Sequence, residues 1–140
     1  MLETKIIFKV IIPGAVFFEL ETKVILFHGK DGDFAILPGH ENLISLTLAG
    51  TVKTGHDVDK LKSTLITSPG IVKVSENVCT LFADRAILIE DIKHNLTTLK
   101  DDLTSSEKIL SKYKKENLAN PFLEDKIKFL EKATSDVVMY

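Results

Sequence analysis

The strongest constraint on the fold is a change of pattern about two thirds of the way along the 140-residue chain. All seven glycines lie before residue 90, and the residues after it include a single proline. Before the change, apolar residues alternate with polar ones, and afterwards they are spaced by three and four. The first pattern is typical of β-strands and the second of amphipathic helices. We therefore predict two domains, residues 1–86 and residues 87–140.

Residues 4–12 show the strand pattern most clearly. Ile6, Phe8, Val10 and Ile12 fall on one face of such a strand, because its side chains alternate with a period of two. Similar short runs follow, each bounded by Gly, Pro or Asn residues that favour turns. They lie at residues 16–20, 23–28, 50–54, 61–67, 71–75 and 78–83. A series of short strands of this kind predicts an antiparallel β-sandwich or barrel.

The second domain shows two helical stripes. The first consists of Ile92, Leu96, Leu99 and Leu103, and the second of Leu123, Ile127, Leu130, Thr134 and Val137. Between the stripes, Asn120 can cap a helix and Pro121 suits its first position. Two stripes joined by a short connection predict an antiparallel helical hairpin. We expect its seam to contain Leu96, Leu99, Leu103, Ile127 and Leu130.

A hairpin of this size is too small to be stable alone. Ordering each residue costs about 1.5 kcal/mol, whereas burying a leucine or isoleucine returns only about 1.5–3 kcal/mol. The stripes must therefore bury their apolar residues against the first domain or against another protein. An element that depends on a borrowed surface can have two docked positions of similar energy, which a switch requires.

The composition argues against several classes of function. A net charge of −2, with 17 lysines and one arginine (Arg85), argues against binding nucleic acid through its phosphates. The single cysteine, Cys79, allows no disulfide framework and no cysteine metal site. The sequence has no phosphate-binding loop, HExxH motif or nucleophile elbow, and its apolar runs are too short to cross a membrane. We therefore predict no catalytic residue, metal or cofactor.

Residues 29–40 (GKDGDFAILPGH) combine three glycines, a proline and two aspartates around an apolar centre. This segment can form a strand between two tight turns. It can also form a shaped loop that presents Asp31, Asp33 and His40 to a partner, since loops held by a rigid scaffold often carry binding residues. These three residues are our candidates for a partner-binding site.

The same segment resembles the epsilon subunit family of the rotary proton-translocating ATP synthase, whose mitochondrial member is called delta. The family carries a Gly-x-x-Gly-x-Phe-Gly-x-Leu-Pro-Gly-His-like string, and here Ala35 stands in place of one glycine. Three further segments resemble the family in the same order: LISLTLAG at 43–50, SPGIVKV at 68–74 and NVCTLFAD at 77–84. Together with the helical tail, the resemblance spans nearly the whole chain.

The resemblance implies a sandwich of about ten strands followed by a helical hairpin. It also implies a non-catalytic subunit at the foot of the central stalk, bound to the gamma subunit and to the c ring. Asp33 would then face the polar loops of the c ring, and His40 would lie near gamma. The helices would lie against the sandwich, or extend along gamma into the catalytic alpha/beta hexamer and inhibit ATP hydrolysis. The chain would be a peripheral subunit on the cytoplasmic side of the cell (inner) membrane, attached to the membrane only through its partners. It would not bind nucleic acid.

One motif of the family is missing. Many bacterial members carry an Ile-Asp-x-x-Arg-Ala motif at the start of the first helix and bind ATP there. Residues 92–97 of this chain read IKHNLT, so Lys93 replaces the acid and Leu96 replaces the arginine. We therefore expect no nucleotide-binding site in this stretch.

Two alternative functions stay open at this point. A closed β-barrel with a helical lid would bind a small ligand on its own, and this alternative predicts a monomer with an internal cavity. An enzyme would use His40 with Asp31 or Asp33 as a proton-transfer pair. The second alternative predicts that replacing His40 by alanine abolishes activity.

Overall fold

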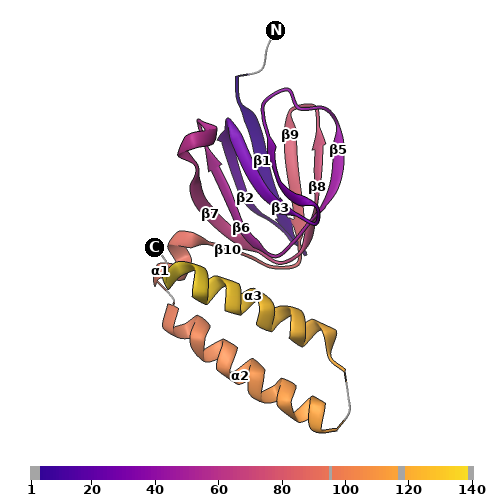
Figure 1. Cartoon of the computed structure of the whole chain (residues 1–140), viewed down its shortest axis with the longest axis vertical. Coiled ribbons are helices and arrows are strands. Elements are labelled where there is room, and N and C mark those ends of the chain that lie inside the picture. The colour runs from indigo at the N-terminus through magenta and orange to yellow at the C-terminus, as the bar shows by residue number, and fades with distance from the viewer. Residues whose placement is uncertain (1–3, 95, 117–118, 139–140) are drawn as a thin grey trace.

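A computed structural model of the chain describes residues 4–94, 96–116 and 119–138, and it has the predicted sandwich followed by helices (Figure 1). The strands are β1 (Ile6–Ile12), β2 (Ala15–Thr22), β3 (Val24–Gly29), β4 (Gly32–Ile36), β5 (Leu43–Thr47), β6 (Gly50–Gly55), β7 (Lys62–Thr67), β8 (Gly70–Ser75), β9 (Val78–Ala83) and β10 (Ala86–Leu88). The helices are the 3₁₀ turn η1 (Val58–Lys60), then α1 (Ile89–His94), α2 (Leu96–Lys115) and α3 (Pro121–Val138).

The strands form one continuous sheet that folds over on itself. Its order is β10-β7-β6-β3-β5-β8-β9-β1-β2, and β4 pairs with β3 outside this path. Pairing is antiparallel except between β1 and β9, which run parallel. A parallel pair needs a long crossover connection, and here the strands from β2 to β8 provide it. The path is open, so β2 and β10 are its two ends.

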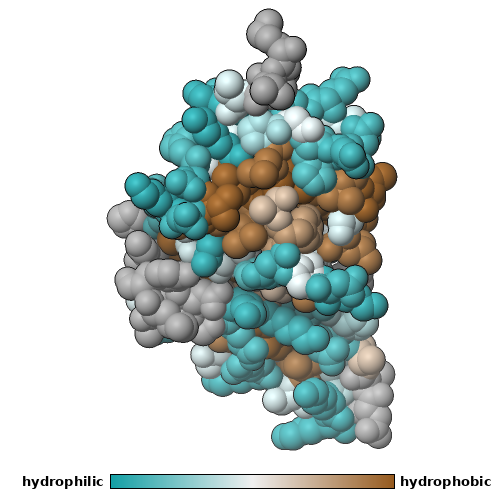
Figure 2. Space-filling model, turned by 45° about the horizontal axis from the view of Figure 1, so that its top comes forward, coloured by the Kyte–Doolittle hydropathy of each residue, from teal (hydrophilic) through white to brown (hydrophobic). Residues whose placement is uncertain are grey.

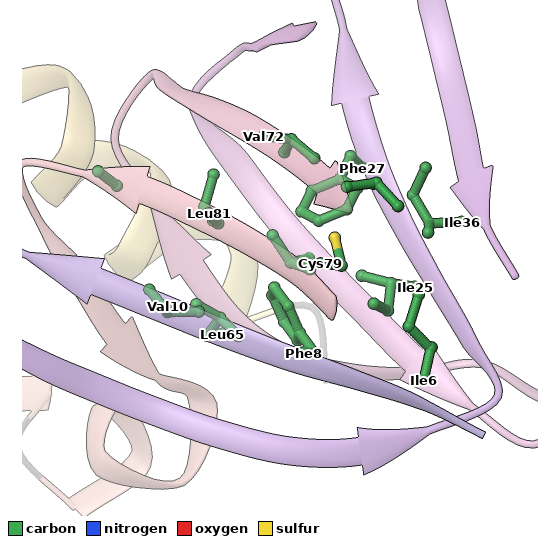
Figure 3. Close-up of a cluster of buried hydrophobic side chains, with 13 residues drawn as sticks. Ile6, Phe8, Val10, Ile25, Phe27, Ile36, Leu65, Val72, Cys79 and Leu81 are labelled. Atoms are coloured by element: carbon green, nitrogen blue, oxygen red, sulfur yellow. The ribbon is translucent and has the colours of Figure 1, made fainter. Parts of the chain in front are cut away.

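Apolar side chains that point inward fill the centre of the sandwich (Figure 3). The alternation predicted for residues 4–12 is confirmed for Ile6, Phe8 and Val10, which are fully buried. Ile12 is only half-buried, because it follows the bulge in the pairing of β1 with β2 and ends the strand. Phe8 packs edge-on against Phe18 and Phe27, with ring centroids 6.1 and 5.7 Å away. Edge-to-face packing is a favoured arrangement of aromatic rings. The core therefore fixes which residues of β1 face outward.

The transition from sheet to helices differs from the predicted one. Residues 86–88 form β10, which pairs with the end of β7, and α1 begins directly after it. The predicted first stripe is divided between two helices, since Ile92 lies in α1 whereas Leu99 and Leu103 lie in α2. A strand of three residues is too short to show a period of two, which is why the sequence pattern did not reveal it. The division into residues 1–86 and 87–140 stays a prediction.

The start of the last helix is confirmed. Asn120 caps α3, because its Oδ1 accepts a hydrogen bond of 3.1 Å from the N–H of Leu123, and Pro121 occupies the first helical position. α2 and α3 lie side by side as the predicted hairpin (Figure 1). α3 lies between the sandwich and α2, and it contacts β6 and β7.

The buried thiol in the core generates a prediction about alkaline pH. Cys79 is fully buried, and loss of solvation raises the pKa of its thiol from 9.0 to about 12. Between these two values the unfolded chain loses the thiol proton while the folded chain keeps it, so the free energy of unfolding falls as the pH rises. Urea unfolding followed across this range should show a steeper loss of stability in the wild type than in Cys79→Ala. Identical slopes for the two chains would contradict this origin of the loss.

Candidate partner-binding surfaces

The segment at residues 29–40 begins as a tight β-hairpin. β3 and β4 pair so that His28 lies opposite Asp33 and Gly29 lies opposite Gly32. Gly32 has a φ of +121°, a conformation that residues with side chains rarely adopt. The turn holds Asp31 exposed at the tip. The segment is thus a strand between turns that also presents a carboxylate to solvent.

Asp33 has a partner that sequence reasoning missed. Its Oδ1 lies 2.6 Å from Nδ1 of His28, directly across the hairpin. The two side chains are 56% and 38% exposed, so the ion pair itself stabilises the fold only slightly. The imidazole also packs against Gly50, where an added Cβ would lie 2.9 Å from the ring. The strand register of the hairpin is the signal that would have predicted this pair.

His40 lines the same groove as the hairpin residues, but the hydrogen bond of its side chain is to the neighbouring main chain. Its Nδ1 donates to the carbonyl oxygen of Glu41 at 2.7 Å. Asp31, Asp33 and His40 line one open groove of about 620 Å³, together with residues 43–46. The structure therefore brings the three predicted residues around a single groove, and their role in partner binding stays a prediction. Asp33 pairs with His28, so the Asp33–His40 form of the alternative proton-transfer pair is not formed.

A row of apolar side chains crosses the outer face of the sheet beside this groove. The register places five of them on neighbouring strands: Leu46 (β5), Ile71 (β8), Phe82 (β9), Ile11 (β1) and Val16 (β2). Four of the five are strongly exposed, by 65% for Leu46, 45% for Ile71, 42% for Phe82 and 60% for Val16. Large contiguous apolar patches on a protein surface mark interaction sites. We call these five residues the docking band.

The docking band has a sharp border. The next row of the same face begins with Ile44 and is otherwise polar, with Lys73, Thr80, Lys9 and Glu19. An open groove of about 760 Å³ runs along the band, and its lining includes Lys30 from the hairpin tip. In Figure 2 hydrophobic side chains reach the surface at the right edge of the sandwich, where Figure 1 places β5 and β8. The band and the hairpin therefore form one continuous surface.

The residues predicted for the helical seam differ in burial, and their role in the seam stays a prediction. Ile127 and Leu130 are buried, and Leu99 and Leu103 are half-buried. The side chain of Leu96, at the first position of α2, lies outside the described residues. An ion pair that the sequence pattern did not indicate joins the two helices, with Nζ of Lys126 2.9 Å from Oδ1 of Asp102.

A second apolar cluster attaches the hairpin to the sandwich. We call it the latch cluster, and its buried members are Ile66, Ile89, Ile92, Phe129, Leu130 and Ala133, with Ile87, Leu99 and Leu103 packed around them. Ile66 comes from β7, so the helices do borrow a surface from the first domain, as their small size predicted. Phe129 and Ala133 were missed because they lie beside the predicted stripe of α3. Their spacing of four residues is the signal of this second face.

Residues 5–89, more than half of the chain, match the family described as ATP synthase, Delta/Epsilon chain, beta-sandwich domain. This chain belongs to that family. The match covers the whole sheet and ends at the first residue of α1. The family that the sequence resemblance pointed to is thereby confirmed.

Individual relatives agree with the family. The chain is 30% identical over 81 residues to the ATP synthase epsilon chain of Campylobacter fetus subsp. fetus. This match covers 58% of this chain and 62% of the relative. It is 27% identical over 120 residues to the ATP synthase epsilon chain of Aliarcobacter butzleri. That match covers 84% of this chain and 91% of the relative. The match thus spans less than two thirds of the first relative and most of the second.

A solved structure shares the fold. A chain in the cryo-EM structure of the Euglena gracilis mitochondrial ATP synthase superposes with a TM-score of 0.63 at 14% sequence identity, over 100% of this chain and 84% of that one. None of the helices in the described part of this chain has the length and apolar character needed to cross a membrane. Among the described residues, no group of three or more His, Cys, Asp or Glu side chains could hold a metal ion.

Shortening Phe129 tests the latch cluster. Phe129→Ala should loosen the hairpin and leave the sandwich folded, because the latch cluster and the sandwich core share no buried residue. Truncating a buried phenylalanine costs about 3–5 kcal/mol, so amide hydrogen exchange in α1 and α3 should accelerate by more than about tenfold. Lys128→Ala, at the neighbouring exposed position, should change neither domain. Equal acceleration in β1 and β9 would show that the two clusters do not act separately.

Proposed function

We propose that this chain is a non-catalytic subunit of the central stalk of a proton-transporting ATP synthase. In this role it fastens the gamma subunit to the c ring, rotates with both, and helps to couple proton flow to ATP synthesis on other subunits. Family membership supports the complex. The observation that carries the proposal is the docking band, an exposed apolar surface on a sandwich whose own core is already complete. Such a surface is stabilised when a partner covers it.

Gamma is the partner that we assign to the docking band. Permanent interfaces have apolar centres and polar rims, and this face offers an apolar row with a polar row beside it. Leu46 belongs to the band and also lines the groove that His40 lines, so His40 lies at the edge of the same surface. This arrangement supports a contact between His40 and gamma.

The c ring is the partner that we assign to the tip of the hairpin. Asp31 and Asp33 are exposed there and can accept hydrogen bonds from polar loops. Exposed charges of this kind add specificity more than affinity. Lys30 lines the groove along the docking band, so the two partners would meet neighbouring parts of one rigid body. Torque would then pass through paired strands instead of a flexible linker.

The helices supply a regulatory role in this proposal. The latch cluster holds them against β7 in the state described above. If released, α2 and α3 are about 30 Å and 27 Å long at 1.5 Å per residue, so they can extend along gamma toward the alpha/beta hexamer and inhibit ATP hydrolysis. The lysines near the end of α2 would then meet acidic segments of that hexamer.

The same proposal specifies where the chain is located and which ligands it does not bind. The chain would be a peripheral subunit on the cytoplasmic side of the cell (inner) membrane, held there by gamma and the c ring. It would bind no nucleotide itself, since Lys93 and Leu96 replace the acid and the arginine of the family's ATP motif. We also propose that it binds no metal and no nucleic acid.

A charge placed in the docking band tests the contact with gamma. Ile71→Glu should weaken binding to purified gamma about 30-fold or more, because burying an unpaired charge costs more than about 2 kcal/mol. Isothermal titration calorimetry with the two purified subunits measures this change. Val58→Glu is the matched control, since Val58 is also an exposed apolar residue but lies in η1, outside the docking band and the polar row beside it. An equal loss in both variants, or none in either, would rule out the band as the contact.

Removing the helices tests the regulatory role. The complex assembled with a chain that ends at Glu90 should hydrolyse ATP faster than the complex with the full chain, because the inhibitory segment is absent. Proton pumping driven by ATP should persist, since the sandwich alone carries the proposed contacts with gamma and the c ring. Both rates can be measured on the same reconstituted vesicles. An unchanged hydrolysis rate would remove the regulatory role and leave the coupling role intact.

A further inference from the structure

The longest strand of the sheet lies at one of its two ends. β2 has eight residues, and on its outer side no strand of the described chain pairs with it. Natural edge strands are often protected by charged side chains, above all lysine, by proline, by bulges or by a covering helix. Residues 15–22 (AVFFELET) contain no lysine or proline, and their charged residues, Glu19 and Glu21, are exposed on the outer face of the sheet. The remaining residues are mostly of types that favour strands. A bulge interrupts the pairing with β1 near Phe17, but residues 18–22 pair regularly. This edge is therefore open to a further strand.

The opposite end of the sheet is protected. β10 has only three residues, it covers residues 65–67 of β7, and α1 follows it at once. Short edge strands and a covering helix are two ordinary ways of blocking further pairing. One edge is therefore covered, whereas no strand of the described chain pairs with the longer edge. Such an asymmetry is expected when the open edge has a partner.

An open groove of about 650 Å³ lies where the sheet fails to close. One wall is β2, with Phe18 and Leu20, and the other is formed by the start of β7 and the end of β10. Leu61 and Leu88 add apolar surface on that second side. Both ends of the nine-strand path thus border the same groove, and the exposed residue Val16 of the docking band lies on β2 itself. The band therefore reaches the free edge that borders the groove.

We propose that an extended segment of the protein that covers the docking band adds to β2 as a further strand and fills this groove. The inference rests on the proposed function, in which that protein is gamma. Strand addition supplies main-chain hydrogen bonds to an open edge, and pockets for alternate side chains supply selectivity. Here the open edge and the apolar groove are adjacent, and both adjoin a proposed interface. One extended segment can therefore pair with the edge and fill the groove.

The two faces of β2 specify the sequence of that segment. Side chains on its inner face would pack against Phe18 and Leu20 and must be apolar. Side chains on its outer face would lie beside Glu19 and Glu21, which are exposed, so basic residues fit there. The occupant is therefore a strand in which apolar and basic residues alternate.

The far wall of the groove adds one requirement. It carries Lys53 and Lys62 against a single carboxylate, Glu90. An acidic side chain therefore fits at the point where the segment approaches this wall, and a basic one does not. This preference applies only where the segment meets the far wall, and the side chains that pack against Phe18 and Leu20 stay apolar.

Hydrogen exchange of the full chain, free and bound to purified gamma, tests the proposal. Amides of residues 18–22 should exchange more than about tenfold more slowly in the complex, since an added strand supplies acceptors to those that face outward. A complex that forms while these amides exchange at the free rate would overturn the strand addition and leave the proposed function standing. If no complex forms, the proposed function fails and this inference fails with it.

Two variants separate the groove from the docking band. Leu20→Lys should weaken binding to gamma more than about tenfold and remove the added protection of residues 18–22. Because Leu20 is half-buried, Glu19→Lys at an exposed position of the same strand serves as a second variant that does not disturb the core. It should weaken binding by opposing the basic face of the segment. Val58→Lys is the matched control, since Val58 is 58% exposed and lines neither surface. Unchanged binding in both test variants would overturn the inference.

Discussion

The inward burial of β1 is the constraint on which the candidate surfaces depend. β1 pairs with β9 on one side and β2 on the other, and Ile6, Phe8 and Val10 point into the core. A slip of one residue would turn these three side chains outward and Ile11 inward. Burial of side chains of this size is worth about 1.5–3 kcal/mol each, so the slipped register is strongly disfavoured. The position of the docking band is thus a consequence of how the core packs.

The hairpin tip and the docking band are also held together. The N–H of Leu48 donates a hydrogen bond of 2.9 Å to the carbonyl of His28, which ties β3 to the segment after β5. His28 in turn pairs with Asp33 and packs against Gly50. A force applied at the tip is therefore passed to the band through main-chain hydrogen bonds and close packing. A subunit that joins two rotating partners needs this kind of stiffness.

Local features could be predicted from the sequence, and features that depend on register could not. The alternation in β1 and the cap at Asn120 depend on neighbouring residues, so their patterns were sufficient. Leu46 and Phe82 lie far apart in the sequence, and each looks like an ordinary apolar residue of its own strand. Only the pairing of β5, β8 and β9 makes them neighbours. The resemblance identified the family and the hairpin loop, but it gave no indication that His28 is the partner of Asp33.

The helices can leave the sandwich without breaking it, because β7 divides its side chains between two clusters. Leu65 points into the sandwich core, and Ile66, the next residue, points toward Phe129 and the rest of the latch cluster. Release of the hairpin therefore exposes one face of β7 and leaves the other face buried. Exposing Ile66 costs about 1.5–3 kcal/mol, and the apolar residues of the helices add to this cost. A surface on another subunit must return that free energy before an extended state can be populated. The folded position is thus the stable one for the isolated chain, and in the proposed function contact with another subunit would make a second position accessible.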